Sequence, residues 1–123
     1  MVGSDVVLFE RVRPMLEVIG RNVNHVGPTG AGLAAKIVNK MILGINLAAV
    51  CEAAVLGERL GLSARALYEI VQTSTGDSWA WDHWYPIAGV VDDSPATLGF
   101  APGFKTSLIT KDLALAQQAP RAA

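Results

Sequence analysis

The first quarter of the chain changes from a helical pattern to an alternating one. Apolar residues recur at spacings of three and four over residues 5–19, which predicts an amphipathic helix. Ser4 and Asp5 are both suited to cap its start, and Gly20 is suited to end it. Pro14 falls inside the pattern and predicts a kink or a break there. Residues 22–26 then alternate between polar and apolar side chains, which predicts a short edge strand left without its sheet.

The middle of the chain is a long apolar segment from residue 33 to residue 60. Within it, residues 41–51 contain a single polar side chain, that of Asn46. A helix that is apolar on every side must be covered on every side, so the pattern predicts a central, buried helix. Gly61 is suited to end it, because glycine tolerates the left-handed conformation that commonly follows a helix.

The second half of the chain predicts shorter elements. Ser63 is suited to cap a helix over residues 64–72. The apolar face of that helix is expected to consist of Leu67, Ile70 and Val71. Residues 73–103 are rich in Gly, Pro, Ser, Asp and Trp and predict short helical turns and loops, and residues 104–119 predict a last helix. The fold class is therefore expected to be all-α, with a long central helix preceded by a short βα segment.

The composition is apolar for a chain of 123 residues. Hydrophobic residues make up 51% and the mean hydropathy is +0.36. Only 17% of residues are charged, against a usual share of about 25%. Such a chain is too apolar to be disordered. The surplus predicts a surface that a partner subunit or a further part of the protein covers, and hence a homodimer or a higher homo-oligomer.

Several kinds of partner and site are disfavoured. A formal net charge of −1 gives no reason to expect a nucleic acid, and no stretch of about 20 residues lacks strongly polar groups, which argues against a membrane span. The single cysteine, Cys51, cannot form an internal disulfide and is expected to be a small buried side chain. His25 and His83 lack the spacing of a metal-binding pair, so no metal is expected. The N-terminus lacks a signal-peptide pattern, and a cytoplasmic location is expected.

Three glycines open the long helical segment in the sequence Gly27-Pro-Thr-Gly30-Ala31-Gly32. Backbone N–H groups at a helix N-terminus lie at its positive end, where they can bind a carboxylate or a phosphate. The glycine spacing differs from the G-x-G-x-x-G of dinucleotide-binding turns. A flexible loop with an ordinary helix start explains the same residues, and the composition alone favours that explanation.

Lys36 follows one turn after Gly32, and Asn39 and Lys40 share its helix face because they lie three and four residues further on. Lys36 also precedes the most apolar part of the chain, so it borders surface that is expected to be buried. A lysine in that position can serve as a general base. The alternative is a solvated basic patch at the start of a helix, which is the commoner role of a lone lysine.

Two further groups of residues allow both a structural and a functional interpretation. Lys111 and Asp112 are neighbours in the last predicted helix, where they point in different directions and are expected to be an ordinary exposed pair. The second group is an aromatic cluster of Trp79, Trp81, Trp84 and Tyr85. Such a cluster can line a ligand pocket or contact a subunit, and it can equally well fill a core.

Four segments together resemble one known family. They are GPTGAGLAAKIVNK at 27–40, EAAVLGERLGL at 52–62, TSTGDSWAW at 73–81 and GFKTSLITKDLALA at 103–116. In this order they resemble the substrate-binding part of the β-hydroxyacid dehydrogenases. The aromatic loop and the stretch PIAGVVDDSP at 86–95 are similar to the 3-hydroxyisobutyrate dehydrogenase branch. Residues 2–27 resemble the end of that family's nucleotide-binding domain, so the resemblance covers nearly the whole chain.

The resemblance implies a role for each candidate residue. Lys36 is implied to be the catalytic general acid/base, taking the hydroxyl proton of a small hydroxyacid substrate while hydride passes to NAD or NADP. The implied substrate-binding residues are Gly30, Ala31, Gly32, Asn39 and Lys40. The residues implied to contact the cofactor are Phe104, Lys111 and Asp112.

The chain departs from the family's pattern in two ways. Many members carry a second amide side chain where this chain has Lys40, so the resemblance leaves the substrate open. The family also begins with a domain carrying G-x-G-x-x-G and continues with further helices. Residues 1–27 are therefore expected to be the end of a nucleotide-binding domain, and residues 28–123 a truncated helical substrate and dimerisation domain that is inactive alone. The alternative is a non-catalytic dimerisation or binding module derived from such an enzyme.

Overall fold

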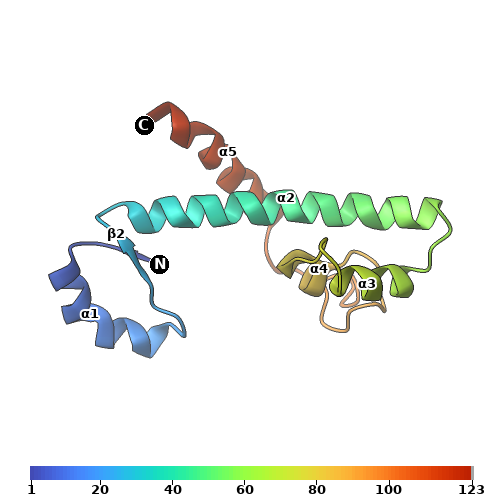
Figure 1. The fold of residues 1–123 in the computed structure, drawn as a ribbon, viewed down its shortest axis with the longest axis horizontal. Helices are drawn as coiled ribbons and strands as arrows, with labels where there is room; N and C mark the ends of the chain where they lie inside the picture. Colours follow the sequence, from blue (N-terminus) through green and yellow to red (C-terminus); the bar gives the residue numbers. More distant parts are fainter. Residues whose placement is uncertain (123) are drawn as a thin grey trace. The chain divides into compact units, whose positions relative to one another are not determined.

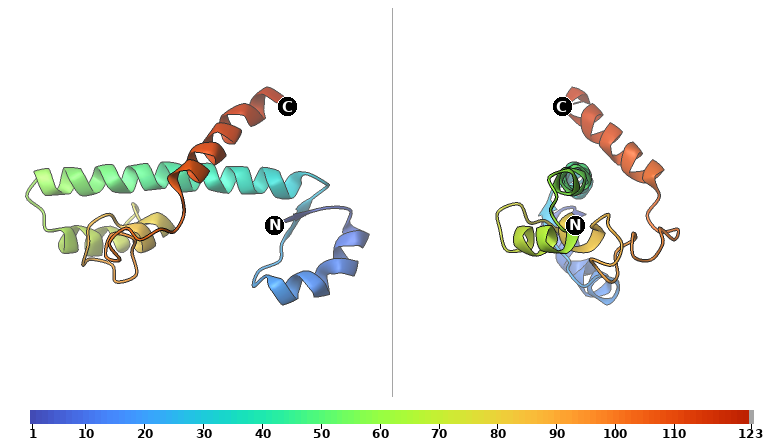
Figure 2. Two further views of the ribbon diagram at one scale, coloured as in Figure 1. Left: turned by 180° about the vertical axis from the view of Figure 1, so that it is seen from behind. Right: turned by 90° about the vertical axis from the view of Figure 1, so that its right-hand side faces the viewer.

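The computed structural model describes residues 1–122 and places five helices and two short strands in them (Figure 1, Figure 2). In chain order these are β1 (Val2–Gly3), α1 (Val6–Ile19), β2 (His25–Gly27), α2 (Ala31–Arg59), α3 (Ala64–Gln72), α4 (Trp79–Trp84) and α5 (Thr106–Ala122). The described chain is mostly helical, as the apolar pattern predicts. It forms two compact units, one made of residues 1–41 with the end of α5 from Asp112, the other of residues 42–111.

Helix α1 begins where the sequence places it. The carboxylate of Asp5 accepts hydrogen bonds from two backbone N–H groups of the first turn, at 2.8 and 3.3 Å, and so satisfies donors that a helix start leaves unpaired. The helix gives way to extended chain at Gly20. It runs through Pro14 as one element, so the prediction of a break is wrong. Proline removes one N–H group there, and the ion pair of Arg13 with Glu17, at 2.7 Å, supports the same turns.

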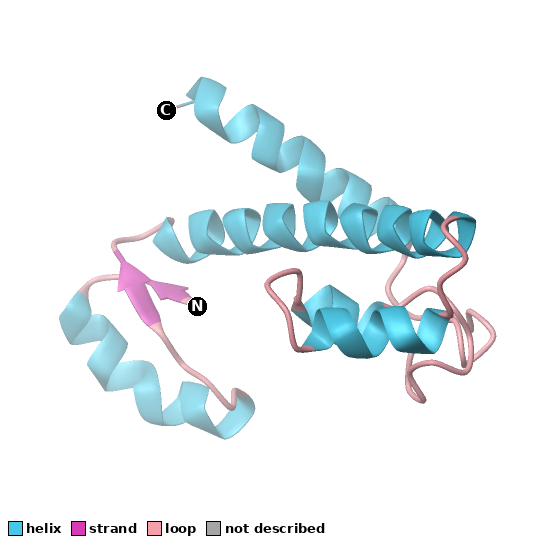
Figure 3. Cartoon of the chain, turned by 45° about the vertical axis from the view of Figure 1, so that its right-hand side comes forward, coloured by secondary structure: helices cyan, strands magenta, loops and turns pink. Residues whose placement is uncertain are grey.

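The strand predicted at residues 22–26 is shifted toward the C-terminus and has a partner. The N–H of Val2 donates to the carbonyl oxygen of Asn24 at 2.8 Å, and that of Ser4 donates to Gly27 at 2.9 Å. The two strands therefore pair in parallel (Figure 3), and the prediction of a strand without its sheet is wrong. The sequence conceals β1 because two residues show no period. Parallel strands need a crossover connection, which α1 provides, so β1, α1 and β2 form a βαβ unit.

Strand β1 lies directly against the start of α2. A Cβ atom at Gly3 would lie 2.7 Å from the backbone nitrogen of Gly32, 2.9 Å from that of Ala31 and 2.6 Å from the carbonyl oxygen of Pro28. Real Cβ atoms do not approach backbone atoms so closely, so only glycine fits at this position. The contact sets how near the βαβ unit comes to the first turn of α2.

The core of the second unit is aromatic. Tyr68 of α3, Trp81 of α4 and Tyr85 meet with ring centroids between 4.9 and 6.3 Å apart, and Val50 and Ala54 of α2 complete the cluster. The indole N–H of Trp81 donates to the carbonyl oxygen of Tyr68 at 3.1 Å, so this buried donor is satisfied. Trp81 and Tyr85 therefore fill the core, which is one of the alternatives left open for the aromatic cluster.

Helix α2 ends at the predicted glycine. Gly61 adopts φ +79°, and its N–H and that of Leu62 each donate to a carbonyl group of the last helical turn at 3.0 Å. The turn reverses the chain, and α3 runs back beside the C-terminal part of α2 (Figure 1, Figure 2). Ser63 caps α3 as predicted, because its Oγ accepts from the N–H of Ala66 at 3.1 Å.

The buried face of α3 differs from the predicted one in one residue. Leu67 and Val71 pack against the aromatic core, and Leu67 occupies the space that a side chain at Gly57 would need. Ile70 is 64% exposed, so its assignment to the buried face is wrong. Tyr68 takes that role instead, because its ring reaches the other aromatic side chains.

The prediction that α2 is buried on every side is wrong for the described chain. Its buried residues are Val50, Ala54 and Gly57. Six large apolar side chains elsewhere on the helix are at least half exposed: Leu33, Val38, Ile42, Ile45, Val55 and Leu56. A helix of this composition needs neighbours around its whole circumference, and the core described above covers one stripe of it.

The same helix meets one criterion of a membrane span. Among the described residues, α2 is the one helix long and apolar enough to cross a bilayer, on length and composition alone. This is weak evidence, because the core helix of a water-soluble protein passes the same test. Its charged side chains lie toward the two ends of the helix: Lys36, Lys40, Glu52, Glu58 and Arg59.

Candidate functional site

The glycine-rich segment forms the start of α2. Gly30 adopts φ +94°, which glycine tolerates, and its carbonyl oxygen accepts from the N–H of Ala34 at 3.0 Å. A side chain at Gly30 would meet nothing within 4 Å, so the space beside it is open. The N–H of Ala31 donates to the carbonyl oxygen of Pro28 at 3.0 Å. Of the three residues expected to offer N–H groups to a carboxylate, Ala31 therefore already uses its own in a turn.

Lys36, Asn39 and Lys40 lie together on one face of α2, because residues three and four apart are neighbours on a helix. Lys36 and Asn39 are exposed, and Lys40 is half-buried. Lys36 lies five residues after Ala31, or about 7.5 Å along the helix axis. Side chains on a helix tilt toward its N-terminus. Lys36 lies one turn after Gly32, so it belongs to the N-terminal end of α2.

The residues that the resemblance assigns to the cofactor lie around the start of α5. Phe104 precedes the helix and is 44% exposed, and Lys111 is exposed in its second turn. Asp112 is only 8% exposed, so the expectation of an ordinary exposed pair with Lys111 is wrong for this residue. Successive helix residues are rotated by about 100°, which leaves the lysine in solvent and turns the carboxylate inward.

The site residues fall into two groups by compact unit. Lys36, its neighbours on α2 and Asp112 belong to the first unit, and Phe104 and Lys111 belong to the second. Each group is therefore described within its own unit. The first group combines an open helix start with a lysine, and the second combines an exposed aromatic ring with a lysine.

A cavity of about 660 Å³ lies beside Phe104 within the second unit. Its wall is mostly apolar and is built by α2, the end of α4, the loop before α5 and the first turn of α5. Among the lining residues are Leu47, Cys51, Trp84, Phe100, Phe104 and Ile109. The rings of Trp84 and Phe104 stack with centroids 6.1 Å apart and planes 24° from parallel. This arrangement suits a flat, apolar ring.

Sequence reasoning missed this cavity and misplaced one of its residues. Cys51 is exposed at its wall, so the expectation of a buried thiol is wrong. Trp84 belongs to the aromatic cluster and lines the cavity, as the ligand-pocket alternative for that cluster requires. Both Cys51 and Trp84 are considered in the sequence analysis. The loop of residues 86–103, which completes the cavity around them, has no hydrophobic period from which its path could be derived.

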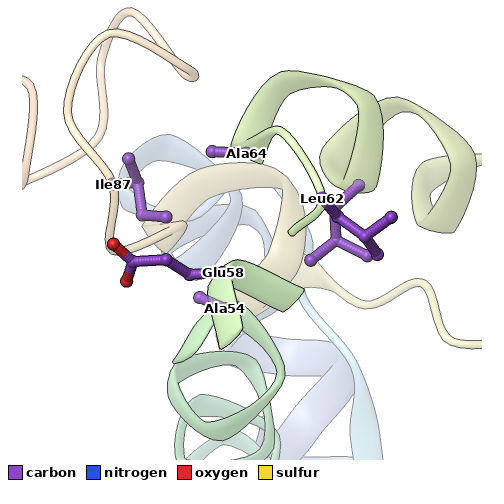
Figure 4. Close-up of a pocket in the computed structure, with 6 residues that line it drawn as sticks. Ala54, Glu58, Leu62, Ala64 and Ile87 are labelled. Atoms are coloured by element: carbon purple, nitrogen blue, oxygen red, sulfur yellow. The ribbon is translucent and has the colours of Figure 1, made fainter. Parts of the chain in front are cut away.

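A second, smaller cavity of about 270 Å³ lies where α2 meets α3 (Figure 4). Its walls are apolar side chains, including Ala54, Leu62 and Ile87, with the single carboxylate of Glu58. A lone carboxylate among aliphatic groups has no acid or base partner in the lining. This cavity therefore lacks the pair of groups that proton-transfer chemistry uses.

The buried tyrosines are structural groups. Burial raises the pKa of Tyr68, and the nearby Asp82 and Asp77 raise it further. Burial also raises the pKa of Tyr85. Both phenols therefore stay neutral well above physiological pH. In the part of the chain that the structure describes, no three His, Cys, Asp or Glu side chains gather in a way that could hold a metal ion.

Comparison with known proteins gives a consistent result. Residues 30–123 match the family described as "NAD-binding of NADP-dependent 3-hydroxyisobutyrate dehydrogenase". A probable 3-hydroxyisobutyrate dehydrogenase of Mycobacterium bovis is 45% identical over 97% of this chain, and an NAD-dependent L-serine dehydrogenase of Pseudomonas aeruginosa is 42% identical over 99% of it. The solved structure of Mycobacterium tuberculosis 3-hydroxyisobutyrate dehydrogenase with L-serine superposes on all of this chain with a TM-score of 0.91 at 43% identity.

The chain spans a minor part of each of these relatives. It covers 40% of the M. bovis protein, 41% of the P. aeruginosa protein and 43% of the M. tuberculosis chain. The similarity in sequence and the similarity in backbone extend over nearly the whole of the present chain, from the βαβ unit to α5.

Proposed function

The chain belongs to the β-hydroxyacid dehydrogenase family, in its 3-hydroxyisobutyrate dehydrogenase branch, and we propose that it is the helical part of an oxidoreductase acting on a small hydroxyacid. The family uses NAD or NADP. The oxidation would convert a β-hydroxyacid such as 3-hydroxyisobutyrate to its semialdehyde. A cytoplasmic location and a homodimer or higher homo-oligomer belong to the same proposal.

One observation carries the proposal: an exposed lysine, Lys36, lies one turn after a glycine-rich helix start that is open beside Gly30. A substrate carboxylate bound beside Gly30, where the space is open, would lie near the positive end of α2. The substrate hydroxyl would then lie near Lys36. Lys36 would accept the hydroxyl proton as hydride leaves the substrate carbon for the nicotinamide, and would return the proton in the reverse reaction.

The neighbours of Lys36 have roles that follow from their chemistry. Asn39 shares the exposed face of α2, and its amide can both donate to and accept from a substrate hydroxyl or carbonyl. Lys40, half-buried on the same face, adds positive charge where a carboxylate would be bound. These residues would orient the substrate, and Lys36 would move the proton.

The second unit offers surfaces that fit part of a nicotinamide cofactor. Phe104 and Trp84 present stacked aromatic rings at an apolar cavity, which suits the face of a pyridine ring. Lys111 carries an exposed positive charge on α5, which suits a phosphate group. Asp112, the next residue along the chain, belongs to the first unit, and its proposed role in cofactor binding rests on the resemblance to the family. When bound, nicotinamide would supply the hydride acceptor that alcohol oxidation requires.

The N-terminal segment supports a division of the chain into two parts. Parallel strands joined by a helix are the unit from which dinucleotide-binding sheets are built. We therefore assign residues 1–27 to the end of a nucleotide-binding domain and residues 28–123 to the helical substrate and dimerisation domain. The sequence contains no G-x-G-x-x-G turn, so the greater part of the dinucleotide would be bound outside these residues.

The test is a hybrid enzyme, in which this chain replaces the corresponding part of the M. tuberculosis 3-hydroxyisobutyrate dehydrogenase. We expect the hybrid to oxidise 3-hydroxyisobutyrate or L-serine with NAD or NADP, and Lys36→Ala to lower its turnover about a hundredfold or more, because the proton acceptor is removed. Lys36→Arg should fail as well, since guanidinium does not lose its proton at working pH.

Two controls make the result specific. Arg59→Ala removes an exposed positive charge of the second unit that lines neither cavity, and should leave most of the turnover in place. The purified 123-residue chain should show no turnover by itself. Near-normal turnover of the Lys36→Ala hybrid would show that the proton acceptor lies elsewhere. Turnover by the isolated chain would contradict the division into domains.

The exposed apolar side chains of α2 favour one alternative, a non-catalytic dimerisation or binding module derived from such an enzyme. In that case the chain would associate tightly with a partner through α2, and the hybrid enzyme would be inactive whichever residue stands at position 36. The two functions are thus separated by the same assay.

A further inference from the structure

The hydroxyl group of Thr97 forms hydrogen bonds to two other residues of the loop that precedes α5. Thr97 Oγ1 accepts from the backbone N–H of Gly89 at 2.9 Å and donates to the carbonyl oxygen of Val91 at 2.7 Å. The hydroxyl of Ser94 donates to Thr97 Oγ1 at 3.2 Å and accepts from the N–H of Thr97 at 3.2 Å. Thr97 is therefore bonded to Val91, six residues before it, and to Gly89, eight residues before it. None of these residues belongs to a helix or a strand.

A residue of α3, Arg65, also forms a hydrogen bond to this loop. The guanidinium of Arg65, on α3, donates to the carbonyl oxygen of Gly89 at 2.8 Å, so both backbone groups of that residue are bound. Ser94 is fully buried, and burial of its hydroxyl requires the partners it finds at Thr97. A polar network of this kind specifies one arrangement of the loop, because any other leaves buried groups unpaired.

The loop before α5 supplies much of the wall of the 660 Å³ cavity, through Pro95, Ala96 and residues 100–104. Pro95 and Ala96 line the cavity from the turn that begins at Ser94. That turn ends at Gly99, and Phe100 follows it with φ +55°, held by its N–H donating to the carbonyl oxygen of Pro95 at 2.6 Å. The chain then continues along the cavity to Phe104. The position of the aromatic wall is therefore set by a turn whose geometry depends on Thr97.

We infer that Thr97 is a positioning residue, whose hydroxyl fixes the aromatic wall of the cavity beside Phe104. The inference rests on the proposed function in one respect, namely that this wall receives the nicotinamide end of the cofactor. Thr97 itself is absent from the cavity lining and acts through Pro95, Ala96 and Phe100. Its effect should therefore be on the shape of the binding surface.

Cys51 provides a direct probe of the wall. It is the single cysteine of the chain, it lines the cavity, and its thiol is exposed to reagents. We expect Thr97→Val to raise the rate of Cys51 alkylation by iodoacetamide in the 123-residue chain at least about fivefold, because it removes both backbone hydrogen bonds of the hydroxyl and each of ordinary net strength is worth about that factor. Thr97→Ser keeps the hydroxyl and should react at the original rate.

Two further variants separate positioning from general stability. Thr73→Val is the matched control, because the hydroxyl of Thr73 bonds only to carbonyl groups of its own helix, at 3.3 and 3.4 Å, and the alkylation rate should not change. Arg65→Met removes the hydrogen bond from α3 to the loop at an exposed position and should raise the rate by a smaller factor. This variant keeps the inference testable if Thr97→Val does not fold, as judged by circular dichroism.

The hybrid enzyme supplies the functional measurement. Thr97→Val should raise the KM for the dinucleotide severalfold while kcat changes little, and Thr97→Ser should restore it. If folded Thr97→Val and Arg65→Met chains are alkylated at the original rate, the positioning role is refuted, whatever the hybrid does. If alkylation responds as expected and the hybrid has no activity, the proposed function fails and the role of Thr97 in shaping the cavity stands.

Discussion

Gly3 limits how closely the βαβ unit and α2 approach each other. We expect Gly3→Ala to lower the free energy of unfolding by about 1–3 kcal/mol, because the added methyl group overlaps backbone atoms, which cannot move aside as a flexible side chain can. Urea unfolding followed by circular dichroism measures the change. Gly76→Ala is the control, since a Cβ there meets only a side-chain atom, Val71 Cγ1, at 3.4 Å. Equal stability of the two variants would contradict the close contact at Gly3.

Lys111 gives a second prediction for a single residue. In the hybrid enzyme, Lys111→Ala should raise the KM for the dinucleotide more than it lowers kcat, because the lysine is proposed to bind the cofactor and to take no part in proton transfer. Lys111→Arg retains the positive charge and should recover most of the affinity. A fall in kcat at unchanged KM would place Lys111 in the chemical step instead.

A single side chain caps the start of α3, so its contribution to stability can be measured by substituting that one residue. Ser63→Ala removes the hydroxyl that accepts from the N–H of Ala66, and should destabilise the second unit by about 1 kcal/mol. Ser63→Asp keeps an acceptor at the cap and should retain the original stability. Thermal unfolding monitored by circular dichroism distinguishes the two. If both variants melt at the same temperature, the cap contributes nothing to stability.

The elements with local signals are those that the sequence predicts correctly. Asp5, Gly61 and Ser63 each satisfy backbone groups within three residues of themselves, so their roles can be derived without knowing the rest of the fold. β1 has no such signal, because its two residues become a strand only through pairing with β2. Asp112 and Ile70 were misplaced for a related reason, since the face that a helix buries depends on neighbours far along the chain.

The candidate site shows the same division. Lys36, Asn39 and the glycines Gly30 and Gly32 could be grouped from spacing alone, because they lie in the first turns of one helix or directly before it. The engagement of the Ala31 N–H with Pro28 could not be derived, because it depends on the geometry of the turn before the helix. The cavity beside Phe104 depends on an irregular loop held by Thr97, and no periodic pattern describes such a loop.

At the scale of the whole molecule, the main unexplained surface is the apolar exposure of α2. Ile45 and Leu56 are 59% and 57% exposed, although the helix is among the most apolar parts of the chain. Burying one such side chain contributes about 1.5–3 kcal/mol. Because this chain spans about 40% of the relatives it matches, further segments of a longer protein or a second copy of the chain can provide the cover.

These two kinds of cover predict different behaviour in solution. If copies of the chain cover each other, sedimentation at micromolar concentration should give a dimer or a larger species, and Ile45→Glu should shift it toward monomer because a charge would be buried at the contact. Val18→Glu, at an 85% exposed position on α1, is the control and should leave the association unchanged. A compact monomer that tolerates both substitutions would contradict self-association, and would favour cover by segments of a longer protein.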